Sequence, residues 1–461
     1  MTETRTKTRV PQGWANGWRQ WLAVFGWSLV VAVGANVGLS SIWLSIGLAG
    51  LVVLIMGGRR FPLWAAPSFV FLAGLVIYGR SLETLEIGTP AWNFRLGGLL
   101  VSLWISGLLY ILLATLARYI GVRRMRRVFS PAFSGALMVL LALSLLPRIF
   151  SFAYYEPLLA SGGPAYKYVL VAVAAFVGYF ITTSLSKKVG QQPASAILIG
   201  LAGGVAMGLL LDAVELLWIS KSLDETLMIG FMNASFFAET APTPLHNLEA
   251  YFGFWQYLHF DWESLLLFVP LVLVTVSEHM ASLTRYALAA PNPEESPHAD
   301  KTILIEGVAV LVGGMVSGVP LTFNEDTVAI GTRLPKARPL VLVLLALFTI
   351  GLSAYLPIAR AFDLIPLPAV GGVLVAWAGY QAVRGFGRVT ERIHDDLHPQ
   401  ATALAMVVLG AGILMTTMEF ISDFLGNTSL RIMIGTTPIP SYLIIILLAF
   451  VLNLLFPRLV E

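Results

Sequence analysis

The residues that decide the fold are LVLVTVSEHMAS (271–282) and, further along the chain, VPLTFNEDTVAIGTR (319–333). Both runs are mainly apolar, yet five ionisable groups fall at the expected membrane depth within the window from 271 to 333. These groups are Glu278, His279, Glu306, Glu325 and Asp326. A charged side chain at membrane depth costs about 3 kcal/mol on insertion scales, and it usually faces a cavity, a partner or a bound solute. We therefore expect a membrane protein whose functional site lies in this window.

Composition places the whole chain in the membrane class. It has 461 residues, of which only 12% are charged, and its mean hydropathy is +0.80. A soluble protein of this size needs far more charge on its surface. The apolar runs are continuous, as in spanning helices, and do not alternate as barrel strands do. The sequence predicts an all-α polytopic membrane protein.

Several function classes lack sequence support. The net charge of +3 does not indicate a nucleic-acid partner, and the absence of cysteine excludes disulfides and cysteine-ligated zinc. Walker lysine, Gly-x-Ser-x-Gly and His-Glu-x-x-His motifs are all missing from the sequence. We expect neither an enzyme nor an ATP-driven pump, and we expect no cofactor and no metal.

Fourteen apolar segments can be counted, and the basic residues orient them. With the N-terminus in the cytoplasm, most Lys and Arg residues, such as the cluster at 118–127, fall in cytoplasmic loops. We expect a multi-pass protein of the cell (plasma or inner) membrane with both termini cytoplasmic. The expected parts are a tail (1–19), a first seven-segment repeat (20–212), an external loop (213–263), a second repeat (264–457) and a C-terminus (458–461).

Two of these segments are short and interrupted by proline, the third (62–79) and the tenth (320–333). Each is third in its half if the chain divides seven plus seven. Because seven is odd, the halves would then be inverted in the membrane. Interrupted segments at matching places in two halves indicate a transporter binding site. The alternative is that each proline simply begins an ordinary helix.

The acids suggest what such a site would hold. On a helix, Ser282 shares the face of Glu278, whereas His279 points about 100° away. Glu325 follows the break in the tenth segment, where freed backbone amides can also bind a ligand. These groups would suit a polar, uncharged, planar solute with several N–H donors. Loss of hydration favours the neutral form of a carboxyl group, so Glu278 can also load and release a proton. The alternative for Glu278 is a structural acid that bonds to a neighbouring helix.

Five motifs, in order, resemble one family. PLVLVTVSEH (270–279) resembles the eighth-helix motif, ending in Glu-His, of the nucleobase–ascorbate (NCS2) transporters, which include uracil and xanthine permeases. APSFVF (66–71) is similar to the family's Gly-Ser-Ser-Phe-Ala-Phe in the third helix, and IPLPAVGG (365–372) to the start of the twelfth. AVFG (23–26) and FSPA (129–132) resemble the first and fifth helices. The resemblance covers essentially the whole chain.

The resemblance implies two inverted seven-helix repeats that divide into a core and a gate domain, short strands in the third and tenth segments, and a homodimer. It implies that Glu278 is the main substrate-binding acid and Glu325 the second, and that Glu278, Ser282 and His279 handle the proton. The other residues expected to bind substrate are Phe69 and Asn324 through their backbones, Phe323 as an aromatic wall, and Ser68. Glu306 and Asp326 remain as further intramembrane acids.

The chain also departs from the family pattern. The tenth-segment signature has Asp326 where the family has Asn, and it is one residue shorter. Ser282 stands where some members have histidine. We expect a secondary-active transporter, a proton symporter for uracil or a xanthine- or purine-like heterocycle, with Na⁺ as the alternative coupling ion. Two competing hypotheses are a transporter of the same fold that moves another solute, such as an anion, and a membrane component that transports nothing.

Overall fold

The structure is a computed structural model. It describes residues 12–35, 37–58, 63–83, 85, 89–121, 124–125, 128–155, 165–185, 195–218, 253–289, 298–323, 327–328, 338–393, 399–425, 432–434 and 437–455. The described part is almost entirely helical, with two short two-stranded sheets. The expected helical class is confirmed.

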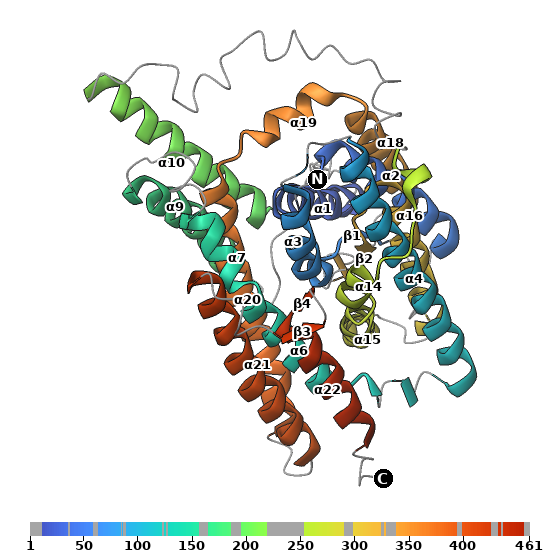
Figure 1. Ribbon diagram of the computed structural model, residues 1–461. Coiled ribbons are helices and arrows are strands. Elements are labelled where there is room, and N and C mark those ends of the chain that lie inside the picture. The colour runs from blue at the N-terminus through green and yellow to red at the C-terminus, as the bar shows by residue number, and fades with distance from the viewer. Residues whose placement is uncertain are drawn as a thin grey trace, which may run out of the picture.

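The helices pack into two groups. The first helix group consists of α1 (Gln12–Ala35), α2 (Leu39–Gly57), α3 (Phe69–Glu83), α4 (Pro90–Ile120), α14 (Trp262–Phe268), α15 (Leu271–Ala289), α16 (Ala299–Val316) and α18 (Pro339–Ser353). The second helix group consists of α6 (Pro131–Ser144), α7 (Leu146–Phe150), the π-helix η2 (Ser151–Tyr155), α9 (Ala165–Ser184), α10 (Ala196–Trp218), α20 (Leu367–Ile393), α21 (Pro399–Leu425) and α22 (Ser441–Leu455). Each group takes helices from both halves of the chain. In Figure 1, α9, α10, α20 and α21 lie together on the left, and α2, α4, α16 and α18 on the right.

Two short helices and a strand hairpin lie outside these two groups. The 3-10 helix η4 (Gly253–Tyr257) packs on α4, and α19 (Leu356–Asp363) follows α18 and packs on α18 and α2. Between α21 and α22, β3 (Ile432–Ile434) and β4 (Thr437–Ile439) form an antiparallel hairpin.

Local sequence signals explain where several helices begin. Thr89 precedes Pro90, and its hydroxyl accepts a hydrogen bond from Trp92 N at the start of α4. Ser130 does the same for Phe133 N at the start of α6, which also begins with a proline. A hydroxyl cap satisfies an amide that lacks an intrahelical partner, and proline suits the first helical position because it has no N–H to satisfy.

Glycine allows a close helix contact in the first group. A Cβ atom at Gly107 on α4 would lie 2.6 Å from Cγ of Leu311, and one at Gly307 on α16 would lie 2.7 Å from Cβ of Tyr110. Both distances are far below a normal carbon–carbon contact. The absence of side chains at these two positions therefore sets how closely α4 and α16 approach.

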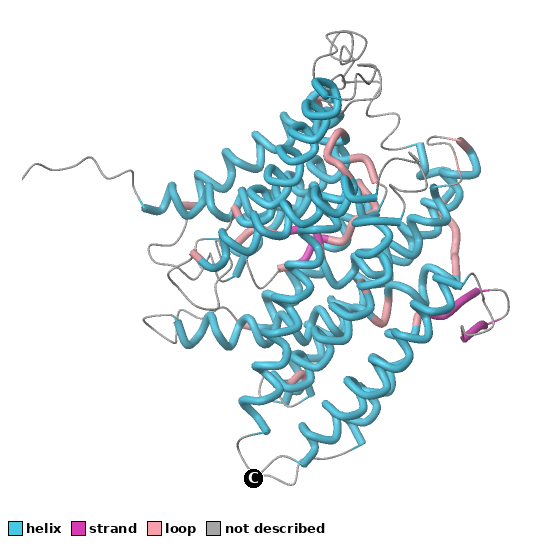
Figure 2. The backbone as a smooth tube through the Cα atoms, turned by 90° about the vertical axis from the view of Figure 1, so that its left-hand side faces the viewer, coloured by secondary structure: helices cyan, strands magenta, loops and turns pink. Residues whose placement is uncertain are grey.

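The two interrupted segments meet at the centre of the molecule. Strand β1 (Ala66–Pro67) pairs antiparallel with β2 (Leu321–Thr322), with Ala66 opposite Thr322. The amide of Ser68 extends the pairing by donating to the carbonyl of Pro320 at 3.0 Å. Figure 2 shows this pair in magenta among the helices. The strand pairing supplies the backbone hydrogen bonds that a continuous helix would make within itself. The two interrupted segments are therefore stable inside the protein.

Helix bounds differ from the expected parts of the chain, for example at both ends of the first repeat and at the start of the second. Helix α1 begins at Gln12, inside the expected tail, and α10 continues to Trp218, past the expected start of the external loop. The first span expected in the second repeat, which starts at 264, divides into α14 and α15 around Pro270, whose missing N–H weakens the helix there. Apolar counting finds only the hydrocarbon part of a helix, whereas polar interfacial residues can continue it.

Six helices of the described residues are long and apolar enough to cross a membrane, and four shorter apolar helices accompany them. The second helix group exposes many apolar side chains. In α9 these include Val173, Phe176, Phe180 and Ile181. The multi-pass membrane class agrees with this apolar exterior, while the count of fourteen spans stays a prediction.

Candidate functional site

Helix α15 places Glu278 inside the first helix group, with only 5% of the residue exposed. Ser277 and Ser282 flank it on the same helix and are also buried, and Ser282 lies one turn further along the face of Glu278. Neither serine hydroxyl has a hydrogen-bond partner among the described residues. A buried carboxyl group with unsatisfied hydroxyls beside it is an arrangement that a polar ligand can complete.

His279 belongs to a buried contact with α16. Its Nδ1 lies 2.8 Å from Oε2 of Glu306, within ion-pair distance but not aligned as a hydrogen bond, and both residues are 1% exposed. Its Nε2 lies 2.8 Å from the hydroxyl of Thr302. Each ring nitrogen of His279 therefore faces a side-chain oxygen of α16.

Glu306 also holds the end of β2. Its Oε1 accepts a hydrogen bond of 3.1 Å from the amide of Phe323, the residue directly after the strand. The Phe323 ring in turn lies 5.8 Å from the His279 ring, centroid to centroid. Glu306 therefore connects α15 and α16 to the interrupted tenth segment, and it is more than a further acid at membrane depth.

Tyr110 adds a polar group from α4. Its hydroxyl hydrogen-bonds the hydroxyl of Thr275 on α15. Sequence reasoning missed Tyr110, Thr275 and Thr302. The spacing of Thr302 and Glu306, four residues apart on one helix face, was a usable signal for one of them.

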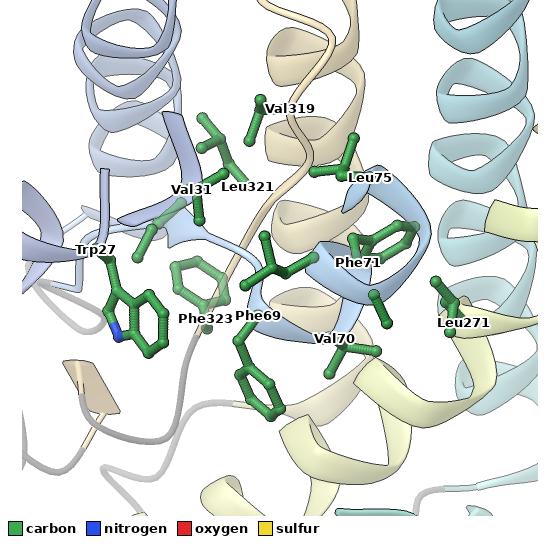
Figure 3. Packing of buried hydrophobic residues seen from close by; sticks show 14 of the residues in the cluster. Trp27, Val31, Phe69, Val70, Phe71, Leu75, Leu271, Val319, Leu321 and Phe323 are labelled. Carbon is green, nitrogen blue, oxygen red and sulfur yellow. The ribbon is translucent and has the colours of Figure 1, made fainter. Parts of the chain in front are cut away.

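The first turn of α3 and the residue before it add further polar groups beside the paired strands. Ser68 is fully buried, and its hydroxyl has no partner within the described part of the chain. Phe69 begins α3, so the amides of this first turn lack intrahelical acceptors and point away from the helix. Figure 3 shows Phe69 where α3 begins and Phe323 where β2 ends.

Three of the expected site residues, Asn324, Glu325 and Asp326, lie outside the described residues, so their roles stay predictions. Of the others, the structure places Glu278, His279, Ser282 and Glu306 on α15 and α16, and Ser68, Phe69 and Phe323 beside the paired strands. Their binding roles stay predictions as well. Together they provide a carboxyl acceptor, amide donors, hydroxyls and aromatic rings, which suit a small planar solute with both N–H and C=O groups.

Sequence comparison identifies the family. A family model described as "Permease family" (Xan_ur_permease) matches residues 20–420 of the chain. The chain belongs to this permease family. The resemblance seen in the five motifs is thereby confirmed, as is the expectation of a membrane transporter and not an enzyme.

Several relatives of the chain are named uracil permeases. The uracil permease of Paenibacillus larvae is 23% identical over 394 residues, which cover 85% of this chain and 84% of that protein. The uracil permease of Escherichia coli K12 is 23% identical over 394 residues, covering 85% and 82%. The probable uracil permease of Haemophilus influenzae is 20% identical over 447 residues, covering 96% and 94%.

Solved structures share the fold. The transmembrane domain of the cyanobacterial bicarbonate transporter BicA superposes with a TM-score of 0.57 at 13% identity, covering 89% of this chain and 97% of that one. The murine anion transporter Slc26a9 in its inward-facing state gives 0.57 at 10% identity, covering 97% and 68%. At this identity the likeness concerns the fold alone, which is that of a membrane transporter.

Proposed function

We propose that this permease is a secondary-active transporter of a nucleobase, either uracil or a xanthine- or purine-like heterocycle. The observation that carries the proposal is the buried Glu278 carboxyl group on α15, in the helix group that also holds the first turn of α3 and the paired strands. The names of the relatives support the same solute class. A carboxyl oxygen of Glu278 accepts a ring N–H group of the nucleobase, and the amides of α3 donate to the carbonyl oxygens of the nucleobase.

The coupling ion is a proton in this proposal. Glu278 takes up the proton. The next residue, His279, is paired with Glu306. The binding of neutral solute and proton then involves no net buried charge at Glu278, which lowers the free energy needed to move the loaded site. Na⁺ is the alternative ion.

Transport proceeds by alternating access, with the first helix group as the core domain and the second as the gate domain. The two groups pack within themselves much more than against each other, which supports movement of one against the other. We extend the proposal to fourteen spans in two inverted repeats, a homodimer surrounded by lipid, residence in the plasma or inner membrane, and cytoplasmic termini.

A thermal-shift panel on detergent-purified protein tests the proposal. The compounds are uracil, xanthine, guanine, adenine and urate, with bicarbonate and sulfate as anions. A ligand at 100 times its Kd stabilises the folded state by about 2.7 kcal/mol. We expect stabilisation by one nucleobase in the wild type but not in Glu278→Gln. Glu263→Gln is the matched control, because Glu263 is a partly exposed acid that pairs with Arg95.

Two results would contradict the proposal. Stabilisation by anions alone would indicate a transporter of the same fold for another solute class. Nucleobase binding that survives in Glu278→Gln would remove Glu278 from the site while leaving the solute class intact.

A further inference from the structure

Helix α20 of the second helix group sends one large side chain against the first group at the site. The Trp377 ring lies 4.8 Å from the ring of Phe69, which begins α3, and 4.9 Å from the ring of Trp27 on α1, in T-shaped contact with both. Trp377 is 1% exposed. A residue of the second group therefore closes the site next to the amides of α3.

Trp377 carries a polar atom into this apolar contact. Its indole Nε1 is buried and has no hydrogen-bond partner among the residues that the structure describes. The two rings that it touches, Trp27 and Phe69, provide no acceptor oxygen. A buried N–H donor without an acceptor destabilises a protein, so native structures nearly always supply a partner, a water molecule or a ligand.

Gln381 repeats this feature one turn further along α20. It is 2% exposed, and its Oε1 is buried without a partner in the described part of the chain. Residues four apart on a helix share a face, so Gln381 lies on the same side of α20 as Trp377. One helix face thus presents an unsatisfied N–H donor and an unsatisfied carbonyl acceptor about one turn apart.

We propose that Trp377 and Gln381 are specificity-determining residues that bind the edge of the solute remote from Glu278. Trp377 Nε1 donates to a carbonyl oxygen of the solute, and Gln381 Oε1 accepts from the adjacent ring N–H. The solute class is a planar heterocycle with such a lactam edge in addition to the N–H group that Glu278 accepts. This inference rests on the proposed function.

The proposal gives the second helix group a direct role in recognition. The contacts from α15 and α3 come from the first group, whereas those from α20 come from the second group, which packs on the first through Trp377. A solute that lacks the lactam edge would leave two buried polar groups unpaired, and such a site discriminates strongly against it.

The test measures binding of uracil, 2-thiouracil, 4-thiouracil, 1-methyluracil and 3-methyluracil to purified protein by calorimetry. The variants are Trp377→Phe, which keeps a ring but removes the N–H, and Gln381→Leu. Trp104→Phe is the matched control, because Trp104 also has a buried indole Nε1 without a partner among the described residues but packs against Gly314 and Trp255, away from α20.

We expect Trp377→Phe to weaken uracil binding about tenfold, the loss of one buried hydrogen bond. It should leave unchanged the affinity for the thiouracil whose sulfur already replaces the oxygen that Trp377 binds. Gln381→Leu should likewise weaken uracil but not one of the two methylated forms. Trp104→Phe should bind all five compounds like the wild type.

Equal weakening of all compounds by Trp377→Phe and Gln381→Leu would show a packing role and overturn the inference, as would no weakening at all. If Trp377→Phe fails to fold, Gln381→Leu decides alone. If the wild type binds none of the five compounds, the uracil-like solute of the proposed function and this inference fall together. If the wild type binds uracil and both variants bind like it, only the inference falls.

Discussion

Removing the Glu306 side chain should destabilise the protein and disconnect the tenth segment from the first helix group. In Glu306→Ala, the buried amide of Phe323 loses the acceptor that it has at 3.1 Å, and Nδ1 of His279 loses the oxygen at 2.8 Å. An unpaired buried amide costs about 1–3 kcal/mol, and breaking a buried pair by removing one partner costs about 3–5 kcal/mol in total. We expect a loss of about 3–5 kcal/mol in the free energy of unfolding.

Glu306→Gln separates the two contributions. Its side-chain carbonyl oxygen can still accept from Phe323 N, whereas the negative charge opposite His279 is lost. We therefore expect a smaller loss, about 1–2 kcal/mol, in the free energy of unfolding. Nucleobase binding should weaken more in Glu306→Ala than in Glu306→Gln, because Phe323 leads directly into the predicted binding residues Asn324 and Glu325.

Denaturant and thermal unfolding in detergent, followed by tryptophan fluorescence, measure both variants. Glu263→Ala is the control. Glu263 and Arg95 pair at 3.4 Å with side chains 33% and 42% exposed, and an exposed pair contributes about 0.5 kcal/mol or less after solvent screening. If Glu306→Ala unfolds within about 1 kcal/mol of the wild type, the proposed structural role of Glu306 is refuted.

Three further predictions concern transport and packing. Glu278→Gln should abolish uptake into proteoliposomes while leaving the unfolding temperature within a few degrees of the wild type; residual uptake above a tenth of the wild-type rate would contradict its role. Wild-type uptake should be driven by an inward proton gradient and stopped by a protonophore. If uptake depends on a Na⁺ gradient instead, the coupling ion is Na⁺ and not the proton. Gly107→Ala should destabilise by about 1–3 kcal/mol because its Cβ would lie 2.6 Å from Leu311 Cγ, whereas Gly351→Ala, with no atom within 4 Å of the added Cβ, should be neutral or stabilising. Equal unfolding temperatures for the two alanine variants would refute this account of the contact between α4 and α16.

Much of the molecule could be predicted from local sequence. Apolar runs indicated the membrane class because a spanning helix satisfies its own backbone groups and needs only apolar side chains over its length. Hydropathy along the chain is therefore sufficient to detect it. The acids at 278 and 306 stood out because charge is costly at that depth wherever the helix packs. The prolines at 67 and 320 marked interrupted segments, since proline lacks an N–H in any context.

Only the tertiary structure decided which of these groups meet. His279 contacts Glu306, and Glu306 accepts a hydrogen bond from Phe323. These residues lie on three different segments, so no helical spacing in the sequence predicts that they meet. The contact between Trp377 and Phe69 joins residues more than half the chain apart. Such contacts depend on how whole helices pack, and packing is the collective result of many small contacts at close range. The sequence by itself therefore determined the class of protein and the acids of its site, while packing chose their partners and brought α20 to the site.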